Sequence, residues 1–208
     1  MTKHALAPAG IAPFDTLAPE TAERVRVWDP LVRYFHWALV AGFATAYLVD
    51  DAFLGLHVWA GYLVLALIAV RLVWGVIGTR HARFTDFVRG PHQVLAYLKD
   101  ALHFRAQRYL GHNPAAGAMV VILLLAVTAT GLSGLALYGA QESAGPWASM
   151  MSGLSASWGD ALKHGHEFFA NLTLVLIAVH VAGVLLSSLS HQENLIGGMI
   201  TGFKRKAD

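Results

Sequence analysis

The chain has 208 residues, of which 56% are hydrophobic and only 13% are charged, and its formal net charge is +2. Because ordinary soluble domains carry about 25% charged residues, this composition excludes a typical soluble protein and indicates a small bundle of membrane helices. The sequence contains no cysteine, which excludes disulfides, thiolate-bound iron-sulfur clusters and covalent haem attachment through C-x-x-C-H.

Residues 1–24 are rich in alanine and proline and lack a continuous apolar core, so we interpret them as a flexible cytoplasmic tail rather than a secretory signal. The rest of the chain, up to residue 203, is predicted to form one membrane domain. A bilayer crossing requires about 20 mainly apolar residues. The stretches of this kind cover residues 31–49, 55–77, 114–138 and 165–189. The predicted fold is therefore all-α, an integral membrane four-helix bundle spanning residues 25–203.

Residues 91–104, between the second and third stretches, predict an amphipathic helix that lies on the membrane surface. Residues 204–208 form a short basic tail.

Most of the 15 lysines and arginines precede or begin the first stretch, lie between the second and third, or end the chain. Short cytoplasmic loops are enriched in these residues, so both termini are predicted to be cytoplasmic.

Within these spans lie the histidines His36, His57, His166 and His180. An ionisable side chain at membrane depth is costly and indicates function. One such histidine is easily explained as a hydrogen bond between helices, but four are not. The alternating directions of the spans place His57 and His166 near the outer side and His36 and His180 towards the inner side.

Helical phase distinguishes between two candidate histidines at the start of the fourth span. His166 and His180 are 14 residues apart, which at about 100° per residue returns to within roughly 40° of the same direction. His164 lies about 160° away from His180 by the same measure. Two facing imidazoles at each of two depths, without cysteine, indicate two non-covalent haems with bis-histidine ligation, bound between helices of the bundle. The predicted pairs are His57 with His166, and His36 with His180.

Arg71 lies 14 residues after His57 and therefore on the same helix face, one haem level deeper. It is predicted to neutralise a propionate of the inner haem. The alternative is an arginine that extends to the cytoplasmic interface, and the sequence does not decide between them.

Four segments carry a resemblance to a known family: "RVWDPLVRYFHW", "HVWAGYLVLALIAVRLVWG", "GHNPAAGAMV" and "HEFFANLTLVLIAVHV". Over residues 25–203 the chain resembles the bacterial cytochrome b-561 family, which includes the membrane cytochrome b subunits of nickel-iron hydrogenases and formate dehydrogenases. The resemblance implies a four-helix cytochrome with two b haems in the bacterial inner membrane. Its haem ligands would be the same four histidines.

The resemblance further implies electron transfer between a periplasmic redox partner (a hydrogenase, another dehydrogenase or a cytochrome c) and the quinone pool, in either direction. It also implies a quinone near the inner haem, where His112 and Asn113 offer hydrogen-bond donors beside small residues. Asn113 and Pro114 equally fit the cap and first position of a helix.

Two other functions fit parts of the sequence. A haem oxidoreductase that works alone, such as a superoxide:quinone oxidoreductase, would have the same ligands. A proton or metal transporter would use the histidines as a relay, but such proteins have broken helices or inverted repeats, which the sequence does not show. An electron-transfer subunit with no catalytic residue of its own is the leading interpretation, and no nucleic-acid partner is expected.

Overall fold

The computed structural model describes residues 23–49 and 53–206. Its long helices are α1 (Pro30–Val49), α2 (Leu54–Ile77), α5 (Pro114–Gln141) and α7 (Ala156–Ser190). The shorter elements are β1 (Arg24–Arg26), η2 (Arg80–Ala82), α3 (Phe84–Phe87), α4 (Pro91–Leu102), α6 (Ala148–Met151), α8 (Leu195–Thr201) and β2 (Phe203–Arg205).

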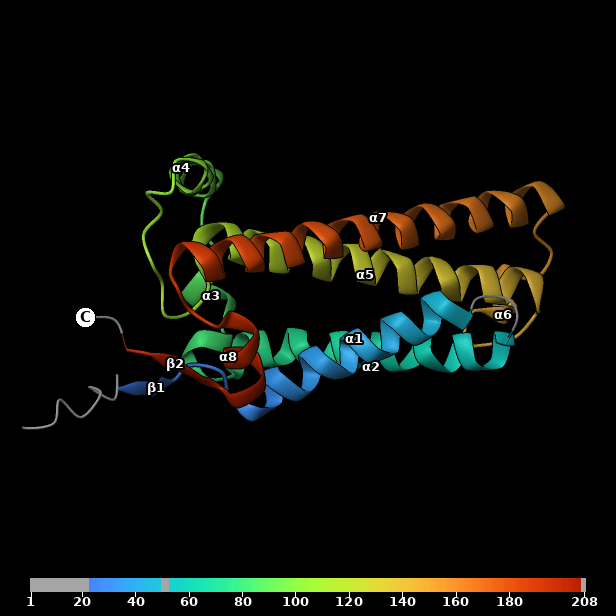
Figure 1. Ribbon diagram of the computed structural model, residues 1–208. Coiled ribbons are helices and arrows are strands. Elements are labelled where there is room, and N and C mark those ends of the chain that lie inside the picture. Colours follow the sequence, from blue (N-terminus) through green and yellow to red (C-terminus); the bar gives the residue numbers. More distant parts are fainter. Residues whose placement is uncertain (1–22, 50–52, 207–208) are drawn as a thin grey trace, which may run out of the picture.

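The long helices form two pairs, and both pairs run along the same axis (Figure 1). α1 packs mainly on α2, α5 packs mainly on α7, and α2 joins the pairs through contacts with α5. The central buried cluster consists of Phe35, Val64, Ile68, Leu124 and Val127, which come from α1, α2 and α5. Among the described residues, α7 contributes none to this cluster.

Three of the described helices are long and apolar enough to cross a membrane, namely α2, α5 and α7. Only 6% of the most apolar window of α7 is buried within the protein. Because an apolar helix exposed on most of its surface is unstable in water, this face requires lipid or a partner. α1 has 20 residues and carries Arg33 and His36 in its first two turns.

Three predicted helix boundaries differ from the structure by two residues or more. α5 ends at Gln141, three residues after the predicted end at residue 138. α7 begins at Ala156, nine residues before the predicted start at residue 165. Its first turns contain the polar residues Asp160, Lys163 and His164. A prediction based on apolar stretches leaves such residues out, although an α-helix can contain them. α4 ends at Leu102, two residues before the prediction, and it lies crosswise to the long helices (Figure 1).

Asp29 explains why α1 begins where it does. Its Oδ1 accepts a hydrogen bond from the backbone N–H of Val32 at 2.9 Å, and Pro30 occupies the first helical position, where a missing N–H costs nothing. Its Oδ2 accepts from Trp74 Nε1 at 3.1 Å and from Thr79 Oγ1 at 2.5 Å. Burial alone would raise the pKa of the Asp29 carboxyl, but these hydrogen bonds lower it below its ordinary value. Asp29 thereby joins the start of α1 to the end of α2.

The two ends of the membrane domain pair as a small antiparallel β-ladder, which an all-α prediction did not include. Arg24 pairs with Arg205, and Val25 pairs with Lys204. Gly202 (φ 89°) turns the chain from α8 into β2, and its carbonyl accepts from the backbone of Val27. The predicted tail boundaries at residues 24 and 204 were therefore misplaced, because Arg24, Lys204 and Arg205 are folded. The rest of the predicted 1–24 tail up to residue 22, and residues 207–208, lie outside the described residues.

A buried ion cluster lies beside this ladder. Glu193 Oε1 lies 2.8 Å from Arg108 Nη2, and Glu193 Oε2 lies 3.2 Å from Lys204 Nζ. Lys204 Nζ also donates to the carbonyl of Tyr109 at 3.1 Å, and Arg108 donates to the carbonyl of Arg205. The cluster connects the loop before α5, the turn after α7 and the end of the chain.

Candidate functional site

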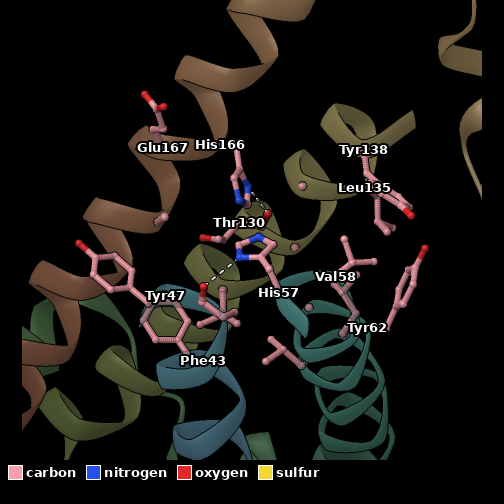
Figure 2. A pocket seen from close by; sticks show the side chains of 18 of the residues that line it. Phe43, Tyr47, His57, Val58, Tyr62, Thr130, Leu135, Tyr138, His166 and Glu167 are labelled. Carbon is pink, nitrogen blue, oxygen red and sulfur yellow. Dashed lines mark hydrogen bonds between the residues drawn. The ribbon is translucent and has the colours of Figure 1, made fainter. Parts of the chain in front are cut away.

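The histidine pair predicted for the outer haem meets at the end of the bundle that lies away from the β-ladder. His57 in the first turn of α2 and His166 in α7 point toward one another (Figure 2). Their ring centroids are 5.9 Å apart, and the ring planes are inclined at 81°. Two helices from different pairs thus bring two imidazoles together.

Hydrogen bonds decide the tautomer of both rings. His57 Nδ1 lies 2.9 Å from the carbonyl oxygen of Ala46, and His166 Nδ1 lies 3.0 Å from that of Thr130 (Figure 2). A carbonyl only accepts, so each Nδ1 carries a proton and each Nε2 carries the lone pair. Histidines that bind metals have this arrangement, in which the second nitrogen donates to a carbonyl or carboxylate. The pair therefore fits axial ligation of a haem iron.

A cavity of about 300 Å³ adjoins the two rings. Its walls are largely apolar, and the hydroxyl-bearing side chains of Tyr47, Tyr62 and Tyr138 are among its lining residues. On α5, a Cβ atom at Gly134 would lie only 3.0 Å from Cε1 of His166. A glycine at this position therefore allows the imidazole to lie directly against the helix backbone.

His164 does not contribute to this cavity. Its side chain is 79% exposed and lies 3.5 Å from the carboxylate of Glu167. Two residues further along the same helix, His166 lines the cavity. His164 and His166 therefore lie on different faces of α7.

The pair predicted for the inner haem is His36 in α1 and His180 in α7. The two side chains are close enough to interact electrostatically, and His180 is half-buried. The 14 residues between His166 and His180 correspond to roughly 21 Å along the helix.

Among the described residues, no group of three or more His, Cys, Asp or Glu side chains forms a metal site. Two imidazoles at each level suit a macrocycle that supplies its own nitrogens better than they suit a bare metal ion.

Arg71 and His112 both lie close to the ring of Phe87. Arg71 is only 3% exposed, and its guanidinium carbon lies 5.0 Å from the centroid of Phe84 and 6.0 Å from that of Phe87. The ring of His112 is 4.5 Å from that of Phe87 and 4.7 Å from that of Trp28. These cation–π and ring contacts hold a buried cation and an imidazole near each other.

His112 and Asn113 have different environments although they are neighbours. Burial, with the nearby charges of Arg71 and Lys204, lowers the pKa of His112 to about 3, so the ring is neutral at physiological pH. Asn113 caps α5, because its Oδ1 accepts from the backbone N–H of Ala116 at 2.8 Å. The cap predicted for Asn113 is present, and its amide nitrogen is a further donor.

Several residues around these histidines were not predicted from the sequence. They are Ala46, Thr130 and Ser133, which contact the outer imidazoles, and Trp28, Phe84 and Phe87, which surround the buried cation and His112. None has a sequence signal of its own, because each role depends on which helices pack together.

Comparison with known proteins assigns the chain to a family. The family model described as prokaryotic cytochrome b561 matches residues 27–202. The chain belongs to this family. The resemblance carried by its sequence motifs is confirmed, and the protein is a membrane b-type cytochrome of electron transport that binds haem.

Curated relatives carry the name "Probable Ni/Fe-hydrogenase B-type cytochrome subunit". The relative from Bradyrhizobium diazoefficiens is 24% identical over 88% of this chain and 87% of its own length. The relative from Rhizobium leguminosarum bv. viciae is 24% identical over 89% and 92%, and that from Cupriavidus necator is 25% identical over 73% and 67%. No solved structure matches the chain.

Proposed function

We propose that this cytochrome has four membrane spans and two non-covalent b haems, and that it carries electrons across the bacterial inner membrane between a periplasmic redox protein and the quinone pool. The outer histidine pair carries the proposal, because both rings have the tautomer and the facing arrangement that an iron ligand requires. Bound haem supplies the one-electron iron couple. The chain supplies ligands, a dry environment and a fixed route between the two sides of the membrane.

α1 is the fourth span in this proposal. Its 20 residues correspond to about 30 Å, the thickness of a bilayer core, and it packs along α2 (Figure 1). The end of the bundle that holds β1, β2 and α4 is rich in lysine and arginine, which supports a cytoplasmic location for this end. The exposed side chains of Leu95, Leu98 and Leu102 on α4 suit a helix lying on the membrane surface.

His57 and His166 are assigned to the outer haem, and His36 and His180 to the inner haem. Arg71 supports the inner assignment, since its guanidinium is buried against aromatic rings and Nη1 has no hydrogen-bond partner among the described residues. A propionate would provide a compensating charge through a charge-assisted hydrogen bond.

The quinone is proposed to bind beside the inner haem, at the start of α5. His112 is a neutral ring there, and the amide nitrogen of Asn113 is a donor that capping does not use.

The names of the relatives favour a hydrogenase as the periplasmic partner. Exposed Met150 and Trp158, in α6 and the start of α7, offer apolar contact area at the outer end.

The haem assignment is tested by matched variants of the purified protein. Acid-acetone should extract two haems per chain, since none is covalent. His166→Ala should lose one haem, whereas His164→Ala, which removes an exposed histidine of the same helix, should retain both. A single haem in the parent protein, or loss of haem from the His164 variant alone, would contradict the proposal.

The quinone site is tested with two conservative variants. Asn113→Asp keeps the cap oxygen but removes the amide donor, and His112→Phe keeps the ring packing but removes both nitrogens. Each should slow haem oxidation by a quinone analogue while both haems stay bound. Unchanged kinetics would leave these residues with a structural role only.

Reduction of the parent by a hydrogenase rather than by superoxide distinguishes the subunit from an oxidoreductase that works alone.

A further inference from the structure

α5 provides no predicted haem ligand, yet it makes two hydrogen bonds to the outer ligand His166. The Nδ1 atom of His166 lies 3.0 Å from the carbonyl oxygen of Thr130 and 3.1 Å from the hydroxyl oxygen of Ser133. Both distances are normal for hydrogen bonds. One side of the imidazole is therefore held by α5, a helix that provides no iron ligand in the proposed set.

The direction of each hydrogen bond follows from the chemistry of the groups. The Ser133 hydroxyl donates to the Thr130 carbonyl at 2.9 Å. Because its proton points to that carbonyl, the Ser133 oxygen presents a lone pair to His166. The Nδ1–H of His166 is then shared between two acceptors, a carbonyl and a hydroxyl oxygen.

The packing around Thr130 fixes this arrangement. Its hydroxyl donates to the carbonyl of Ala126 at 2.9 Å and lies 3.1 Å from the hydroxyl oxygen of Thr173 in α7. Thr173 is 0% exposed, and it lies seven residues after His166 on the same helix. The contacts that α5 makes with His166 and with Thr173 hold α5 and α7 in one register. This register keeps the two acceptors of His166 Nδ1 in place.

Acceptors on the second nitrogen of a ligating histidine increase its basicity and therefore its electron donation to the metal. Stronger donation stabilises the oxidised iron and lowers the reduction potential. We propose that Ser133, together with the Thr130 carbonyl, is a positioning residue that orients His166 and lowers the reduction potential of the outer haem. The inference rests on the proposed function, because it requires His166 to be an iron ligand.

The sign expected for Ser133→Ala follows from this geometry. The variant removes a direct acceptor from Nδ1–H, which weakens donation. It also removes the Ser133 proton from the Thr130 carbonyl, which makes that carbonyl a slightly better acceptor. The second effect acts through an intermediate atom and is the smaller one. The outer haem potential should therefore rise.

The experiment is a redox titration of the detergent-purified holoprotein, followed by optical and EPR spectra that resolve the two haems. Ser133→Ala should shift one potential upward and change the EPR signal of the same haem, with the other haem unchanged. Ser133→Thr keeps a hydroxyl and should restore both properties. The control is Thr128→Ala in α5, because the Thr128 hydroxyl donates to the Leu124 carbonyl of its own helix at 2.6 Å.

His166→Ala separates the inference from the proposed function. If that variant keeps both haems, His166 is not a ligand and the proposed function fails. If it loses one haem but Ser133→Ala leaves both potentials and spectra unchanged, or lowers the outer potential, then the role assigned to Ser133 is overturned while the ligand assignment stands. A shift of equal size in Thr128→Ala would also overturn it, since a general effect on α5 would then explain the result.

Discussion

Replacing Glu193 with glutamine should destabilise the end of the bundle that carries the β-ladder. The side chain of Glu193 is 7% exposed and lies between Arg108, 18% exposed, and Lys204, 4% exposed. Glutamine keeps the shape but removes the negative charge, which leaves two cations close together and largely out of water.

Removing one partner of a buried ion pair costs roughly 3–5 kcal/mol. The lower end of this range applies, about 3 kcal/mol, because Arg108 and Lys204 still donate to the carbonyls of Arg205 and Tyr109. The exposed pair between Lys206 and Glu23, at 2.6 Å beside the same ladder, provides the control. Glu23→Gln should cost no more than about 1 kcal/mol, since exposed pairs contribute little.

The assay is thermal or denaturant unfolding in detergent, followed by tryptophan fluorescence and by haem absorbance. Burial alone would raise the pKa of Glu193, but the hydrogen bond from Arg108 and the charge of Lys204 lower it below 4.5. The stabilisation by Glu193 is therefore fully present above pH 4.5 and is lost as the pH falls through the lower pKa of the folded state. Glu193→Gln should remove that pH dependence.

A double variant tests the mechanism of this loss. Glu193→Gln with Lys204→Met removes one of the two uncompensated cations and should be more stable than the sum of the single effects predicts. Equal stability of Glu193→Gln and the parent would refute the reasoning. Strict additivity in the double variant would show that the charges do not act on each other.

Three further predictions concern other residues. Asp29→Ala removes the cap of α1 and the acceptor of Trp74 and Thr79, and should lower unfolding free energy by about 2–4 kcal/mol in the same denaturation assay. Gly134→Leu should displace His166 and release the outer haem, measured as haem per chain, whereas Gly183→Leu, where a Cβ meets nothing within 4 Å, should retain both. Arg71→Met should lower only the inner haem potential in a redox titration, because a nearby cation favours the reduced form.

The long helices were predictable because each depends on local sequence. Apolar stretches of sufficient length predicted all four to within a few residues, except the start of α7. The cap at Asn113 was also predictable, since Asn before Pro is a local signal. The β-ladder was not, because Arg24 and Arg205 are at opposite ends of the chain and three-residue strands have no periodicity to detect.

The same distinction applies to the site. Histidines stand out in an apolar sequence, and helical phase separates His164 from His166 without any tertiary information. The acceptors of the imidazoles do not stand out, because Ala46 and Thr130 contribute carbonyl oxygens that every residue possesses. Which carbonyl lies beside which ring depends on the packing of α1 against α2 and of α5 against α7.

The four long helices divide the work at the haem sites in the proposed arrangement. α1, α2 and α7 provide ligands, so a substitution at a ligand removes a haem and ends function. α5 provides only hydrogen bonds and close backbone contact, through Thr130, Ser133 and Gly134. A change at Ser133 therefore alters the strength of one ligand while the haem stays bound. In this arrangement the potential of the outer haem can be adjusted through α5 without loss of the haem, because α5 acts on electron donation by His166 and provides no ligand.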